Sequence, residues 1–154
     1  MEALRSIIVD DFSLQRRWEE NAAAQRALFA EYKLDPAHTI ELVSHEGVAK
    51  ILWQGNTIAE SRNAVKLLER KHDAVFYFPP EDVRTDLMER NDHATHCPYK
   101  GDASYWTLQD GARNAENSVW AYESPIEAVA GIKGMMAFYL DSMGKDFGLI
   151  QEID

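Results

Sequence analysis

The chain has 154 residues, which fits one domain with a hydrophobic core of its own. Its composition, 45% hydrophobic and 27% charged, is typical of a soluble globular protein and not of a disordered one. A formal net charge of −10 disfavours binding to nucleic acid or to anionic membranes, since both need clustered Lys and Arg.

The sequence also bears on cellular location. No apolar run approaches the roughly 20 residues of a membrane-spanning helix, and the N-terminus (residues 1–5) lacks the basic and apolar pattern of a secretion signal. The single cysteine, Cys97, permits no internal disulfide. Because free thiols suit a reducing compartment, we expect a cytoplasmic protein without a membrane partner.

The first part of the chain predicts a helix. Residues 12–34 contain no Gly or Pro, and apolar residues recur at helical spacing from Trp18 to Tyr32. Asp35 and Pro36 then end the pattern. We expect residues 1–44 to be an N-terminal helical extension that packs on the domain or on a second copy, giving a monomer or a homodimer. A recognition helix for another partner is the alternative.

From residue 45 to residue 154 the pattern predicts a β-rich domain. Most of its segments read as short strands separated by turn residues. The expected strands are 48–53, 57–60, 74–78, 103–108, 118–122 and 135–140, with a hairpin turn at Gln54–Asn56 and another at Asp110–Gly111. Ser61 is placed to cap a short helix running to Arg70, and residues 81–88 predict a helical turn. The fold class is therefore α+β, mainly β, with a few short helices.

An ordered set of motifs resembles a known family. Its most specific element is the run Cys97-Pro98-Tyr99-Lys100-Gly101. The other elements are Ile58–Ser61, Tyr77–Pro79, Asp82–Val83, Thr95, Trp120–Tyr122, Pro125, Gly134 and Ala137–Tyr139. Over about residues 45–142 the chain resembles the domain of unknown function 427 (DUF427) family. The resemblance implies a compact β-tent-like fold of antiparallel sheets.

The resemblance implies no particular chemistry. The family has carried a nucleotidyltransferase label, but this chain lacks a Gly-Ser pair followed by Asp-x-Asp, a P-loop and a Gly-x-Gly-x-x-Gly turn. Many β-tent proteins bind zinc through two Cys-x-x-Cys motifs, which one cysteine cannot supply. His93 and His96 have no complementary cluster of ligands. We therefore expect no metal and no cofactor.

The Cys97–Gly101 run is the candidate site. Cys97 is a buried small hydrophobe, a thiol in contact with a ligand, or a catalytic thiolate, and it is the candidate catalytic residue. Lys100 is a lone cation in an acidic chain, followed by the permissive Gly101. It can hold an anionic ligand or form a salt bridge to Glu69, Asp82 or Glu123.

Aromatic residues recur in the predicted strands, and they form the core or line a cleft. The residues we expect to bind a ligand are Lys100, Tyr99, Trp106, Tyr77, Trp120, Glu69 and Asp82. The first functional hypothesis is a domain that binds a small anionic or planar ligand in an aromatic-lined cleft. An enzyme acting on a nucleotide-like or other small substrate through Cys97 or a carboxylate is the alternative. A structural or interaction module is the second alternative.

Overall fold

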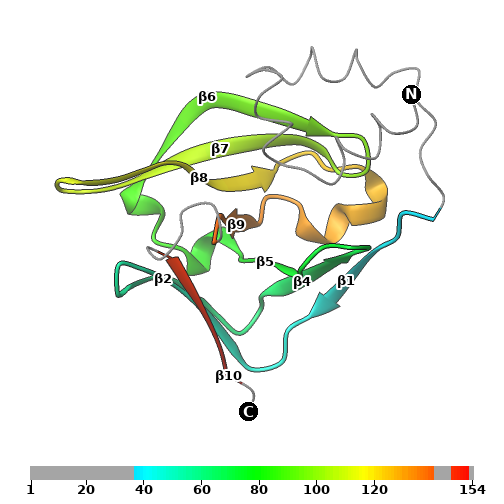
Figure 1. Ribbon diagram of the computed structural model, residues 1–154, viewed down its shortest axis with the longest axis horizontal. Helices are drawn as coiled ribbons and strands as arrows, with labels where there is room; N and C mark the ends of the chain where they lie inside the picture. The colour runs from blue at the N-terminus through cyan, green and yellow to red at the C-terminus, as the bar shows by residue number, and fades with distance from the viewer. Residues whose placement is uncertain (1–36, 141–146, 153–154) are drawn as a thin grey trace.

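The computed structural model describes residues 37–140 and 147–152 (Figure 1). The strands are β1 (Ile40–Ser44), β2 (Val48–Trp53), β3 (Asn56–Ser61), β4 (Val65–Glu69), β5 (Val75–Tyr77), β6 (Met88–Cys97), β7 (Gly101–Asp110), β8 (Arg113–Tyr122), β9 (Met136–Phe138) and β10 (Phe147–Glu152). Three short 3₁₀ helices accompany them, η1 (Pro80–Asp82), η2 (Thr85–Leu87) and η3 (Glu127–Ile132). The prediction of a mainly β fold is confirmed. The helix expected within residues 12–34 lies outside the described residues.

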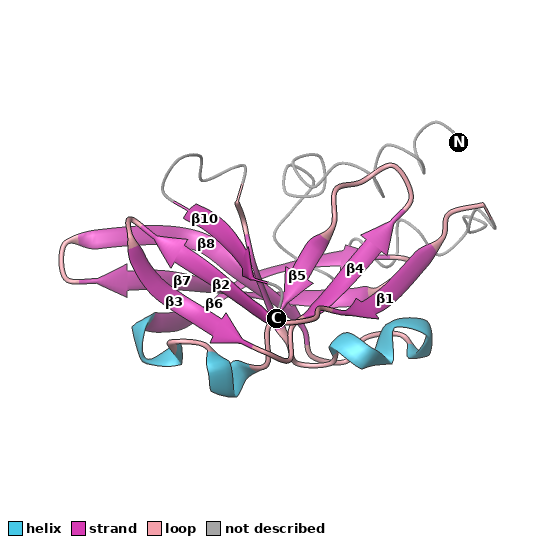
Figure 2. Ribbon diagram, turned by 90° about the horizontal axis from the view of Figure 1, so that it is seen from below, coloured by secondary structure: helices cyan, strands magenta, loops and turns pink. Residues whose placement is uncertain are grey.

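The strands form three antiparallel sheets, in the orders β1-β4-β5, β10-β2-β3 and β6-β7-β8-β9. A single bridge between Phe78 and Met136 links the first sheet to the third. Each of these two residues donates its backbone N–H to the other's carbonyl at 2.8 Å. Seven strands therefore follow one another in the order β1-β4-β5-β9-β8-β7-β6. Figure 2 shows β1, β4 and β5 on one side of the molecule and β2, β3 and β10 on the other.

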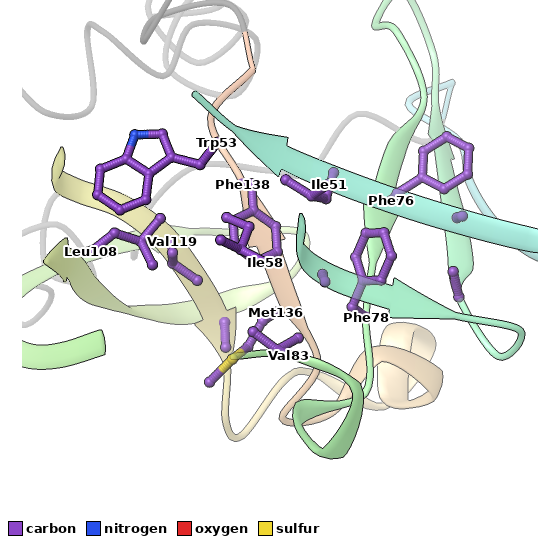
Figure 3. Close-up of a cluster of buried hydrophobic side chains, with 14 of the residues drawn as sticks. Ile51, Trp53, Ile58, Phe76, Phe78, Val83, Leu108, Val119, Met136 and Phe138 are labelled. Carbon is purple, nitrogen blue, oxygen red and sulfur yellow. The ribbon is translucent and has the colours of Figure 1, made fainter. Parts of the chain in front are cut away.

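One face of this seven-stranded surface packs on the β2–β3 hairpin. Alternate residues of a strand point to opposite faces, and Phe76 and Phe78 of the β5 region lie on the same face as Val119 and Ala121 of β8. Figure 3 shows how Ile51, Trp53 and Ile58 of the hairpin lie near Leu108, Val119 and Phe138. This apolar cluster is the main hydrophobic core.

The other face holds a second buried cluster, here called the aromatic face. Its members are Leu67, Tyr77, Cys97, Tyr99, Ala103, Tyr105, Trp120, Tyr122, Val129, Ile132, Ala137 and Tyr139. They include five of the six tyrosines and the only cysteine of the chain. The strand register explains the grouping, because Tyr105 pairs with Trp120, and Trp120 with Ala137, across β7, β8 and β9.

Several elements lie where the sequence predicts them. The hairpin expected at residues 48–60 is β2 and β3, which turn at Gln54 and Gly55 with positive φ angles. The strand expected at 74–78 is β5. The strands expected on either side of Asp110–Gly111 pair as β7 and β8. The helical turn expected at 81–88 is present as the two short helices η1 and η2.

The helix expected from Ser61 to Arg70 is wrong. This segment forms strand β4, which pairs with β1 on one side and with β5 on the other. Ser61 caps no helix, and its Oγ instead donates a 2.6 Å hydrogen bond to Asp82 Oδ2. Tertiary pairing with two neighbours overrides the helical spacing of a short apolar run.

Besides β4, three further strands fall where none was expected. Strand β6 is polar over most of its length and has a bulge between Arg90 and Ala94. Strand β10 follows β9, so the segment expected at 135–140 is not the last strand. Strand β1 lies within residues 1–44, the range that we assigned to the N-terminal extension. The domain boundary expected between residues 44 and 45 stays a prediction.

No helix among the described residues is long and apolar enough to cross a membrane.

Candidate functional site

The turn between β6 and β7 is formed by Cys97 to Gly101. The Lys100 N–H donates to the Cys97 carbonyl at 3.1 Å, which closes the turn. Gly101 then adopts a φ of +117°, a region that L side chains rarely occupy. A Cβ atom there would lie 3.3 Å from the Ser124 carbonyl oxygen. The Ile126 N–H donates to the Lys100 carbonyl at 3.0 Å, so the turn is held from both sides.

Lys100 directs its side chain into the protein and forms a buried ion pair. Its Nζ donates to Glu69 Oε1 at 2.7 Å, and the two side chains are 7% and 5% exposed. The second oxygen, Glu69 Oε2, lies 2.5 Å from His38 Nε2. The His38 ring stacks on the Tyr99 ring with centroids 4.1 Å apart. His38, Glu69 and Lys100 are here called the polar triad.

The polar triad depends on the curvature of the sheet. Glu69 ends β4, whereas Lys100 precedes β7, and three strands separate β4 from β7 in the strand order. In a flat sheet these two strands would lie roughly 19 Å apart, since neighbouring strands are about 4.8 Å apart. A lysine and a glutamate cannot span that distance. The seven strands must therefore curl around the aromatic face, with the ion pair closing its open side.

Both members of the ion pair stay charged. Burial alone would raise the pKa of the Glu69 carboxyl, but the charge and hydrogen bond of Lys100 and the contact with His38 lower it. Burial alone would lower the pKa of the Lys100 ammonium, but the acidic groups of Cys97, Tyr77 and Glu69 raise it above its usual value. The polar triad thus contains a charged ammonium and a charged carboxylate, and His38 contacts the carboxylate.

Tyr77 and Trp120 lie beside this pair. Trp120 Nε1 donates to the Tyr77 hydroxyl oxygen at 3.2 Å, and their rings meet edge to face at 6.3 Å. Burial raises the pKa of the Tyr77 phenol to about 12, although the charge of Lys100 opposes the shift. Tyr77 is therefore a neutral phenol at physiological pH.

Cys97 lies on the aromatic face and is 3% exposed. Burial raises the pKa of its thiol, although the charge of Lys100 acts in the opposite direction. A catalytic cysteine needs a depressed pKa, because the thiolate is the nucleophile. The environment of Cys97 therefore favours a buried thiol over a nucleophile.

Two of the residues expected to bind a ligand lie elsewhere. Trp106 is next to Tyr105 on β7 and points to the opposite face, where the Arg90 guanidinium lies 5.2 Å from its ring. Asp82 accepts the hydrogen bond from Ser61. Glu123, another predicted partner of Lys100, instead pairs with Arg90 at 2.6 Å. Among the three predicted carboxylates, Glu69 is the partner of Lys100.

Two residues of the site were not in the predicted set. His38 contacts Glu69 and Tyr99, but it lies in the range that we assigned to the extension. Tyr122 lies two residues after Trp120 and so shares its face. The strand alternation could have identified Tyr122, whereas no local signal marks His38, because its partners are distant in sequence.

The described residues contain no group of three or more His, Cys, Asp or Glu side chains arranged to hold a metal ion. His96 Nδ1 lies 2.7 Å from Asp102 Oδ1, and the His93 ring packs on Tyr105 with centroids 4.4 Å apart. His96 and His93 thus contact different residues, Asp102 and Tyr105. The expectation of no metal stays a prediction.

A separate open hollow of about 530 Å³ lies at the β7–β8 end of the sheet. All of its lining residues have polar or charged side chains, three of them carboxylates: Glu89, Asn91, Asp92, His93, Thr107, Gln109, Asn114, Glu116 and Asn117. It contains no member of the polar triad. A hydrogen-bond network fills part of it, because Asn91 Nδ2 donates to both Thr107 Oγ1 and Asn117 Oδ1.

The comparison with protein families agrees with the resemblance read from the sequence. No curated protein matches the chain. A family model described as a domain of unknown function (DUF427) matches residues 41–147, which is more than half of the chain. The chain belongs to this family.

Proposed function

We propose that this DUF427 domain binds a small molecule with an anionic or planar group at the aromatic face, beside the polar triad. The observation that carries the proposal is the buried Lys100–Glu69 ion pair. Burying two charges costs free energy that an apolar pair of similar volume does not cost, so an ion pair of this kind is weak evidence for a stabilising role. Sites for small molecules combine apolar and aromatic walls with a few convergent polar groups.

The surroundings of Lys100 support this reading. Tyr77, Tyr99 and Trp120 supply aromatic rings, and Lys100 supplies the one buried Lys or Arg side chain among the described residues. A cation in a water-poor aromatic site attracts a ligand that carries negative charge, while the rings favour a flat one.

Catalysis through Cys97 is the less supported alternative. The raised pKa of its thiol leaves little thiolate at physiological pH. The lowered pKa of Glu69 keeps that carboxylate ionised, which does not suit a general acid. Both features favour a binding site over an active site.

A thermal-shift screen tests the proposal. We would screen the full chain against inorganic phosphate, adenosine monophosphate, benzoate, nicotinate and other small planar or anionic compounds. A compound at about 100 times its dissociation constant should stabilise the protein by about 2.7 kcal/mol. The double variant Glu69→Met/Lys100→Met should lose this stabilisation. Lys50→Met, which removes a partly exposed lysine paired with Glu152 at 3.5 Å, is the control and should keep it.

Two results would contradict the proposal. One is a screen in which no compound stabilises the wild-type protein. The other is a compound that stabilises the wild-type protein and the double variant equally, since its site would then not include the polar triad.

A further inference from the structure

The polar hollow lies on the same face of the sheet as the aromatic face, further along β7. Tyr105, Thr107 and Gln109 are alternate residues of β7, so their side chains point to one face of the sheet. Tyr105 belongs to the aromatic face, whereas Thr107 and Gln109 line the hollow. Glu89 pairs with Thr107 from β6, and Asn114 pairs with Gln109 from β8. Figure 1 shows this end of the β7–β8 hairpin extending beyond the rest of the sheet.

Two irregularities of the strand register shape the hollow. Residues 91–93 of β6 lie opposite Tyr105, where a regular ladder would place one residue. Residues 116–118 of β8 likewise lie opposite Thr107. Bulges of this kind bend a strand and redirect its side chains, and they are common beside functional sites. Because the two bulges flank neighbouring parts of β7, both outer strands bend at the same level of the sheet.

Hydrogen bonds hold the floor of the hollow in place. Asn91 Nδ2 donates to Thr107 Oγ1 at 3.1 Å and to Asn117 Oδ1 at 2.6 Å. Asn91 Oδ1 accepts from the His93 N–H at 2.9 Å, and Thr107 is 9% exposed. These side chains are therefore ordered before a ligand arrives, which lowers the entropy cost of binding.

The charge of the hollow favours a cation. Its lining includes the carboxylates Glu89, Asp92 and Glu116, and none of the described lining residues is Lys or Arg. Within residues 37–140 and 147–152, no ion pair joins these three carboxylates to a basic side chain. A concave site with charges of one sign concentrates ions of the opposite sign. The net charge of the chain, −10, acts in the same direction.

The spacing of the carboxylates distinguishes between kinds of cation. No three His, Cys, Asp or Glu side chains of the described residues are arranged to hold one metal ion, so the carboxylates of the hollow are too dispersed for a compact cation. Dispersed carboxylates suit an extended molecule with several separated ammonium groups, each of which offers three N–H donors. The hollow, at about 530 Å³, has the size of a small-molecule site.

We propose that this hollow is a second binding site, separate from the polar triad, and that it binds an aliphatic polyamine. The carboxylates of Glu89, Asp92 and Glu116 bind its ammonium groups. The side-chain amides of Gln109 and Asn114, which also line the hollow, supply neutral acceptors between them.

Titration calorimetry on the full chain tests this inference. The probes are spermidine, Mg²⁺ as a compact dication and triethylene glycol as a neutral chain, in dilute buffer and again at about 0.15 M salt. Spermidine should bind at one saturable site, several-fold more weakly in the higher salt. Mg²⁺ and triethylene glycol should bind at least about tenfold more weakly than spermidine.

Variants of the three carboxylates locate the site. Glu89→Gln, Asp92→Asn and Glu116→Gln should each weaken spermidine about two- to fivefold, as expected for exposed ion pairs. The triple variant should weaken it at least about tenfold. All three residues are exposed, so the substitutions should leave the fold intact, and urea unfolding checks this.

A matched control separates a site from general attraction. The triple variant Glu41→Gln/Glu60→Gln/Glu81→Gln removes the same net charge from exposed positions that do not line the hollow. It should leave the affinity for spermidine within about twofold of the wild-type value. Glu69→Met/Lys100→Met removes no net charge and should also leave it unchanged, because the polar triad lies outside the hollow.

Four results would overturn the inference. They are no binding of spermidine, equal weakening in the two triple variants, unchanged binding in the variant of the hollow, and binding of Mg²⁺ as tight as that of spermidine. None of them bears on the aromatic face, so the proposed function would stand or fall on its own screen.

Discussion

Lys100 and Glu69 are both buried. If one of them is replaced, water cannot solvate the charge that remains on the other. The sequence could predict that a lysine beside a turn needs a carboxylate when it is buried. It could not select Glu69 over Asp82 or Glu123, because that choice depends on how the sheet curls. His38 could not be predicted for the same reason, since it lies 31 positions before Glu69 in the sequence.

Lys100→Met should destabilise the fold by about 3–5 kcal/mol, because it leaves Glu69 buried without its ammonium partner. The double variant Glu69→Met/Lys100→Met should recover much of that loss, since two apolar side chains replace the pair. Lys50→Met should cost less than about 1 kcal/mol, as expected for a partly exposed ion pair. Urea unfolding of the three variants measures these differences. A double variant that is less stable than Lys100→Met would contradict this view of the pair.

Tyr77 predicts a stability change at alkaline pH. Its folded pKa of about 12 lies above the unfolded value of about 10. Because the folded value is raised, the neutral phenol contributes stability that is complete below pH 10 and is lost as pH rises toward 12. The loss amounts to roughly 3 kcal/mol. Denaturant unfolding at a series of pH values should show it, and Tyr77→Phe should show a smaller loss over the same interval. Equal slopes in both proteins would speak against the assignment.

At the scale of elements, the Cys97–Gly101 turn is the piece that positions the site. Gly101 and Gly55 both have positive φ angles, but only Gly101 has backbone atoms close to where a Cβ would lie. Alanine should cost about 1–2 kcal/mol at either position for the backbone conformation. Gly101→Ala should cost more than Gly55→Ala, because its Cβ presses on the Ser124 carbonyl. Urea unfolding compares the two, and equal losses would show that the contact with Ser124 is unimportant.

Strand β4 shows why part of the sheet was misread. Leu67 and Glu69 are buried and Leu68 between them is exposed, a period of two that a run of five residues barely distinguishes from a helical one. Pairing with β1 and β5 makes this segment a strand, and neither partner strand can be identified from residues 65–69 alone. Strand β6 was missed because its polar residues and its bulge resemble a loop. The hairpins were predictable because their turn residues lie between two apolar runs.

At the scale of the whole molecule, the described strands allow the N-terminal boundary to be tested. A chain that begins at residue 37 keeps β1 and His38, and it should still unfold cooperatively. A chain that begins at residue 45 loses the strand that pairs along β4 and the histidine that contacts Glu69, so it should be markedly less stable. Thermal unfolding followed by near-ultraviolet circular dichroism compares both with the full chain. Loss of cooperative unfolding in the longer variant would show that residues 1–36 belong to the folding unit.

Burial of Lys100 and Tyr77 sets an expectation for the rate of ligand binding at the proposed site. Lys100 and Tyr77 are 6% and 1% exposed, so a ligand would reach them only after the aromatic face opens. When opening precedes capture, the observed rate of association levels off at high ligand concentration instead of rising in proportion to it. Trp120 donates a hydrogen bond to Tyr77 and therefore lies beside the proposed binding site. In a stopped-flow experiment that follows Trp120 fluorescence, the plateau rate should equal the rate at which the aromatic face opens. It should therefore be the same for every ligand.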